Sequence, residues 1–235
     1  MKIKGPLKKA IFIDRPNRFL TRLDLEEAMI ESHLPDPGRL RELLYPGAEV
    51  MVRPVPESSK RKTRFDTVMV IHQGILISLV SSLPNAFAKE LLIQKKLSFL
   101  KDLEYIRPEV TTGKHRFDHL LEDKLGDPYY LEVKSVTYVK DRIAKFPDAV
   151  TARGRSHVQS LGEICKKGGR AGILFVCQRP DADKFSPMYD IDPGFSKALT
   201  QASADGLNIW CITANVTELE MTFYKEIPVY LQPLQ

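Results

Sequence analysis

Two apolar runs in the second half of the chain constrain its fold more than any other feature. Residues 171–177 (AGILFVC) and 207–213 (LNIWCIT) are continuous and uncharged, as expected of strands buried on both faces of a sheet. Residues 149–167 and 193–205 have helical length and end at glycines, and Asp148 is expected to cap the first of them. The order strand, helix, strand, helix, strand favours parallel strands joined by right-handed crossovers. We therefore predict a mixed α/β sheet with helices on both sides.

A helix and three strands precede this unit. The apolar positions of residues 86–100 fall on one helical face, so a helix is expected to start just after residues 83–85. Residues 103–110, 115–121 and 129–136 are rich in strand formers and are separated by short turns, which predicts an antiparallel meander.

The first 84 residues have a different pattern, typical of a small β-barrel. Five strand-like runs occur among turns rich in proline, glycine and polar residues. They are residues 9–20, which are interrupted at residues 15–17, and residues 21–30, 48–54, 65–72 and 74–81. Five short strands favour an OB-fold, a barrel that commonly holds single-stranded nucleic acid between basic loops. We place the barrel at residues 1–84 and the α/β domain at residues 85–235.

The positive charge of the chain is concentrated in the barrel. The net charge is +5; residues 1–84 hold 14 Lys and Arg against 10 Asp and Glu, whereas residues 85–235 hold 21 against 20. This asymmetry indicates that a polyanion is held mainly by the N-terminal part, although mild positive charge also serves solubility. The candidates for phosphate contacts are Arg18, Arg39, Lys60, Arg61, Lys62 and Arg64.

Composition argues against several classes of protein. No apolar run is long enough for a transmembrane helix, and the basic N-terminus lacks the apolar core of a signal peptide, so we expect a cytoplasmic protein. The three cysteines are widely spaced and form no Cys-x-x-Cys pair, which argues against a disulfide framework and against a zinc site.

The strongest chemical signal lies in residues 129–136 (YYLEVKSV). Side chains alternate along a strand, so Glu132 and Lys134 share one face of an otherwise apolar strand, where burial is costly without a purpose. Asp118 lies on the preceding strand, and a hairpin of this span can bring it beside Glu132. Two adjacent carboxylates repel each other unless a cation lies between them, and carboxylate oxygens suit Mg²⁺ or Mn²⁺. With Lys134 holding or deprotonating a water, the set suits phosphodiester hydrolysis; the alternative is a salt bridge on a half-exposed strand.

These residues also carry a family resemblance. The segments that carry it are residues 17–19 (NRF), 35–39 (PDPGR), 42–47 (ELLYPG), 61–63 (RKT), 115–118 (HRFD), 132–137 (EVKSVT) and 146–157 (FPDAVTARGRSH). On these segments the chain resembles the sugar fermentation stimulation protein A family, and its second half resembles the core of PD-(D/E)XK nucleases, with Phe117 where that motif has proline. The resemblance implies an OB-like barrel, a nuclease-like domain, DNA binding and a proposed role in regulating sugar metabolism.

Given this resemblance, each candidate residue has a functional and a structural interpretation. Asp118 and Glu132 are expected to be metal ligands, the alternative being an ion pair with Lys134. Glu90 is on an apolar helix face and is either a third catalytic carboxylate or a solvated one. Arg153 and His157 lie one helical turn apart and so share a face. They are interpreted as nucleic-acid contacts, the alternative being charge on a helix surface.

Three functions are compatible with these features. The first is a divalent-metal-dependent nuclease acting on DNA, with RNA as a second substrate. The second is a non-catalytic DNA-binding regulator that keeps the nuclease fold, and the third is an accessory protein whose barrel binds nucleic acid. The sequence does not decide strand preference, protein partners or oligomeric state, and a homo-oligomer is left open.

Overall fold

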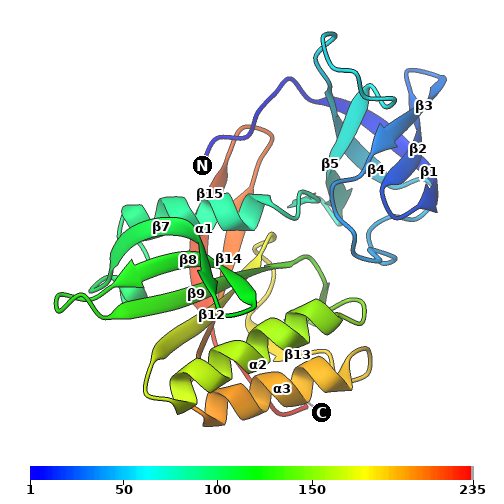
Figure 1. Ribbon diagram of the computed structural model, residues 1–235. Coiled ribbons are helices and arrows are strands. Elements are labelled where there is room, and N and C mark those ends of the chain that lie inside the picture. Colours follow the sequence, from blue (N-terminus) through cyan, green and yellow to red (C-terminus); the bar gives the residue numbers. More distant parts are fainter. Residues whose placement is uncertain (234–235) are drawn as a thin grey trace.

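The computed structural model describes residues 1–233 and consists of a β-barrel followed by an α/β sheet (Figure 1). The barrel sheet has the order β3-β2-β1-β4-β5-β6, and a parallel pairing of β3 with β5 closes it. Its strands are β1 (Lys8–Asn17), β2 (Leu20–Leu25), β3 (Ala28–His33), β4 (Glu49–Pro54), β5 (Phe65–His72) and β6 (Ile75–Ser78). Alternate side chains of these strands point inward and form a separate apolar core. The predicted N-terminal barrel is confirmed.

The barrel has one strand more than the sequence predicts. Residues 21–30 form a tight β2–β3 hairpin in place of one strand, with Leu25 opposite Ala28. Glu26 and Glu27 make the turn with φ values of 56° and 66°. Left-handed backbone is normally supplied by glycine or asparagine, so this turn has no local sequence signal.

The second part is a six-stranded sheet with the order β15-β14-β12-β9-β8-β7. Its strands are β7 (Glu104–Thr112), β8 (His115–Glu122), β9 (Pro128–Val136), β12 (Arg170–Cys177), β14 (Asn208–Val216) and β15 (Met221–Ile227). The antiparallel β7-β8-β9 meander and the parallel β9-β12-β14 unit are both as predicted. Helix α1 (Leu83–Ile93) covers one face of the sheet, and α2 (Ala152–Lys166) and α3 (Pro193–Ala204) cover the other (Figure 1).

Some short elements were not predicted. These are the edge strand β15, the 3-10 turn η1 (Ser98–Leu100), and a small sheet of β10 (Val139–Lys140), β11 (Ile143–Phe146) and β13 (Lys184–Pro187). The helix expected at residues 86–100 ends as α1 at Ile93, and the next turn contains Lys95 with a φ of 50°.

The N-cap prediction for Asp148 is wrong. Helix α2 begins at Ala152, and Thr151 caps it, because the Thr151 hydroxyl accepts a 3.1 Å hydrogen bond from the Gly154 N–H. The Asp148 carboxylate instead accepts hydrogen bonds from the backbone N–H groups of Arg39 (2.7 Å) and Leu40 (3.4 Å). Asp148 therefore ties a loop of the barrel to the α/β sheet.

The N-terminal segment makes a second link between the two parts. It runs from the barrel back to β15, where Lys2 pairs with Glu220 and the Ile3 N–H donates to the Leu219 carbonyl (Figure 1). The division at residues 84 and 85 stays a prediction; helix α1 begins at Leu83. Within residues 1–233, no helix has the length and apolar character needed to cross a membrane.

Candidate active site at the domain junction

A cavity of about 570 Å³ lies where the barrel meets the α/β sheet. On one side it is lined by the barrel residues Arg18 and 36–38, and on the other by Asp118, the C-terminal half of β9 and residues 145–151. Ligand sites of open α/β sheets form beyond the carboxyl ends of strands, which is where this cavity lies on β9. The cavity is therefore the natural place to examine the predicted chemistry.

Glu132 is the most deeply buried charged group in this cavity. Only 2% of the residue is exposed. Its Oε1 atom accepts hydrogen bonds from Lys134 Nζ (2.5 Å) and from His157 Nδ1 (2.7 Å), whereas its buried Oε2 atom has no partner in the described chain. Burial raises the pKa of Glu132, but the bonds from His157 and Lys134 outweigh burial and lower it. Glu132 is thus an ionised carboxylate with one occupied and one bare oxygen.

Asp118 lies beside Glu132 because its side chain takes the place of a backbone hydrogen-bond acceptor in the β8–β9 pairing. The β8–β9 pairing reaches His119 opposite Leu131, and the next free N–H of β9, that of Val133, donates to Asp118 Oδ2 at 2.8 Å. Asn85 at the start of α1 lines the same cavity. Burial, followed by the charge of Glu132, raises the pKa of Asp118.

These two carboxylates fit a hard divalent cation. A buried carboxylate oxygen without a donor is costly, and a cation beside Asp118 and Glu132 would satisfy it and relieve their repulsion. Mg²⁺ and Mn²⁺ commonly use one or two carboxylates and complete their shell with waters and phosphate oxygens. No group of three or more His, Cys, Asp or Glu side chains within residues 1–233 is arranged to hold a metal, so the chain offers no more than this two-carboxylate set.

Only some of the other predicted site residues lie at the cavity. Arg18 and Arg153 are exposed and line the cavity, while His157 lines it from a buried position. The structure does not bring Glu90 there, because its side chain pairs with the Met1 amine at 3.2 Å and is 38% exposed. Arg39 reaches the junction through its backbone N–H, and its side chain is outside the cavity lining.

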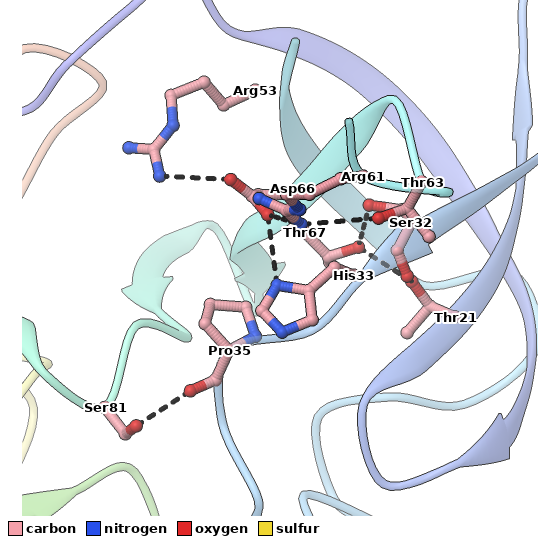
Figure 2. Close-up of polar contacts among 10 residues, drawn as sticks. All are labelled: Thr21, Ser32, His33, Pro35, Arg53, Arg61, Thr63, Asp66, Thr67 and Ser81. Carbon is pink, nitrogen blue, oxygen red and sulfur yellow. Dashed lines mark hydrogen bonds and ion pairs between the residues drawn. The ribbon is translucent and has the colours of Figure 1, made fainter. Parts of the chain in front are cut away.

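The basic loop before β5 has partners of its own within the barrel. Asp66 accepts from Arg61 at 2.6 Å, pairs with Arg53 at 3.5 Å and contacts His33 Nδ1 at 3.1 Å (Figure 2). Arg64 donates to the Ser59 carbonyl at 3.3 Å. The remaining basic side chains of this loop, which are exposed, are Lys60 and Lys62. All four basic residues of this loop are thus exposed, and its two arginines also hold the loop together.

Two residues were missed by sequence reasoning: Asp36, which lines the cavity, and Arg15, which holds the backbone of that lining. Asp36 is 6% exposed and accepts from the Gly38 N–H at 2.7 Å, while Arg15 donates four hydrogen bonds to backbone carbonyls of residues 18–39. A methyl group on Gly38 would lie 2.7 Å from the Asp148 carboxylate, so the close approach requires glycine. The Pro-Asp-Pro-Gly turn was visible in the sequence, but its partner Asp148 is about a hundred residues away.

Comparison with known proteins identifies the family. A model of the sugar fermentation stimulation protein RE domain matches residues 82–220, and a model of the SfsA N-terminal OB domain matches residues 13–79. The chain belongs to the sugar fermentation stimulation protein A family. Members from Clostridium perfringens (strain SM101) and Clostridium botulinum (strain Langeland) are each 38% identical to this chain. They cover 98% and 97% of it, and 100% and 99% of their own lengths.

One solved structure agrees with this family assignment. SfsA of Pyrococcus furiosus, in complex with Ca²⁺, has a TM-score of 0.88 and 25% identity over 98% of each chain. A repair endonuclease from Pyrococcus abyssi has a TM-score of only 0.31 at 14% identity over 87% of each chain. The family and the predicted fold of barrel plus mixed α/β sheet are therefore established.

Proposed function

We propose that this protein is a divalent-metal-dependent nuclease that hydrolyses phosphodiester bonds of DNA in the cavity at the domain junction, with RNA as a second substrate class. The observation that carries the proposal is the bare, buried Oε2 atom of Glu132 beside Asp118. A structural ion pair with Lys134 would account for Oε1 alone. The Ca²⁺ complex of the Pyrococcus furiosus family member supports the use of a divalent cation.

Each side chain of the set has a role in this proposal. Asp118 and Glu132 hold Mg²⁺ or Mn²⁺, which supplies Lewis-acid stabilisation of the charge that develops on the phosphate oxygens. Lys134 lies within 2.5 Å of Glu132 Oε1, so its ammonium is fixed at the cavity wall and can orient the attacking water. The exposed guanidinium groups of Arg18 and Arg153 line the same cavity and suit phosphate oxygens of a bound strand.

The barrel supplies the sequence-independent part of DNA binding. Lys60 and Lys62 are exposed and lie on the same barrel that contributes Arg18 to the cavity. Lysines of this kind bind phosphates electrostatically and without reading bases. A strand that contacts the barrel and reaches Lys134 must cross the domain junction, which explains why the site is shared between both parts.

The test is cleavage of plasmid and single-stranded DNA with Mg²⁺ or Mn²⁺ by wild type, Asp118→Asn and Lys134→Met. Loss of either group should reduce turnover by roughly 10²–10⁴-fold, as is usual for a group that acts on the reacting atoms. Lys140→Met changes an exposed lysine outside the cavity and serves as the control. Equal cleavage by all four proteins would overturn the proposal. Salt-sensitive binding without turnover in either metal would favour the non-catalytic regulator instead.

A further inference from the structure

We infer that His157 is a positioning residue, which fixes the Glu132 carboxylate so that its Oε2 atom stays available to the cation. This inference rests on the proposed function, because it assumes that Glu132 is a metal ligand. It also replaces the sequence-based interpretation of His157 as a nucleic-acid contact.

The position of His157 is fixed by packing. Its side chain is 8% exposed, and its ring meets those of His115 and Phe117 edge-on, at centroid distances of 5.4 and 6.0 Å. The start of α2 is also anchored, since Thr151 caps the helix and donates its own N–H to Asp192 at 2.8 Å. With the helix start and the ring both held, the Nδ1 atom has little freedom to leave Glu132.

The bond from His157 determines which way Glu132 turns. Both donors, His157 Nδ1 at 2.7 Å and Lys134 Nζ at 2.5 Å, meet on Oε1, and neither contacts Oε2. A carboxylate that accepts two bonds on one oxygen keeps the lone pairs of the other for a cation. With Lys134 as the single donor, the carboxylate can rotate and turn its second oxygen towards the ammonium. The imidazole thus fixes the orientation of Glu132, as groups hydrogen-bonded to metal ligands generally do.

Arg153 provides a matched comparison on the same helix. It lies one turn before His157 and lines the same cavity, but it is exposed and suits contact with a phosphate. The two residues should therefore affect different quantities. His157 should control binding of the cation, whereas Arg153 should control binding of the DNA.

The experiment measures Mn²⁺ binding without DNA, by titration calorimetry and by the electron paramagnetic resonance of free Mn²⁺, and then KM and kcat for DNA. His157→Phe keeps the ring but removes the donor, and should weaken Mn²⁺ binding about 10–100-fold while leaving KM for DNA nearly unchanged. His157→Asn restores an N–H near the Nδ1 position and should recover part of the affinity. Arg153→Ala should raise KM and leave Mn²⁺ binding unchanged.

The outcomes separate this inference from the proposed function. If Asp118→Asn weakens Mn²⁺ binding but folded His157→Phe does not, the inference is overturned and the metal site stands. A rise in KM without a change in Mn²⁺ affinity would return His157 to a DNA contact. Wild type that binds no Mn²⁺ would overturn both. Should His157→Phe fail to fold, weaker Mn²⁺ binding by His157→Ala that is recovered in His157→Asn supports the inference, and unchanged affinity in both opposes it.

Discussion

Asp36 and Asp66 are two aspartates of the barrel segment whose carboxylates have very different surroundings. Asp66 lies inside the barrel's own charge cluster, and hydrogen bonds from Arg61 and His33 outweigh burial and lower its pKa. Asp36 lies at the domain junction, where its carboxylate accepts from the Gly38 backbone and Arg15 binds its backbone carbonyl. Burial, only partly offset by the Gly38 bond, raises the pKa of Asp36 to about 6.

The barrel and the junction differ in how far the charge of a buried carboxylate is offset by neighbouring groups. In the barrel, the charge of Asp66 is offset by Arg53 and Arg61, which belong to the barrel itself. At the junction, Asp36 and Asp118 both have raised pKa values caused mainly by burial, and Glu132 keeps a bare oxygen. Asp36 and Asp118, whose pKa values are raised mainly by burial beside one cavity, thus have the perturbed titration that is typical of functional sites.

The largest change in the free energy of unfolding is expected for Asp36→Asn, which removes the charge and keeps an oxygen for the Gly38 N–H. Because the native carboxyl binds its proton more tightly than the unfolded one, wild-type stability falls as the pH rises from about 4 to about 6. Relative to wild type, the variant should therefore gain roughly 2–3 kcal/mol of unfolding free energy at pH 8. That gain should shrink as the pH falls below 6. Urea denaturation at pH 8 and pH 4.5 measures this gain. A variant less stable than wild type at pH 8 would contradict the claim that the charge of Asp36 destabilises the fold.

A smaller effect of opposite sign is expected for Asp66→Asn. A lowered native pKa means that the ionised carboxylate stabilises the fold at every pH above its unfolded value and loses this effect only in acid. The variant should lose about 1 kcal/mol at pH 8 and should still be less stable than wild type at pH 5. The same urea titrations test this, with Asp24→Asn, an exposed aspartate of β2, as the control. A gain in stability at pH 8 would remove the distinction between the two regions.

Much of the fold could be predicted because its signals are local. The apolar runs that became β12 and β14, and the turns between β7, β8 and β9, are properties of neighbouring residues. The hairpin at Glu26 and Glu27 was missed because its left-handed turn contains no glycine. Strands as short as β10 contain too few residues for alternation to be recognised.

The site was only partly predictable for a similar reason. The strand pattern predicted that Glu132 and Lys134 share a face, and the 2.5 Å contact between them confirms it. Asp148 could not be placed, because its partners are backbone groups that lie 108 and 109 residues away in the sequence. The burial of His157 depends on how α2 packs against the sheet, and its periodicity alone does not distinguish a ring that holds a carboxylate from an exposed charge.

The most direct test of the central claim is anomalous diffraction from crystals of the full chain soaked with Mn²⁺. We expect one peak at coordination distance, roughly 2–2.5 Å, from Glu132 Oε2 and from an Asp118 carboxylate oxygen. We also expect that His157 and Lys134 remain on Oε1. No peak at saturating Mn²⁺, or a Glu132 whose two oxygens are both occupied by protein donors, would contradict the central claim.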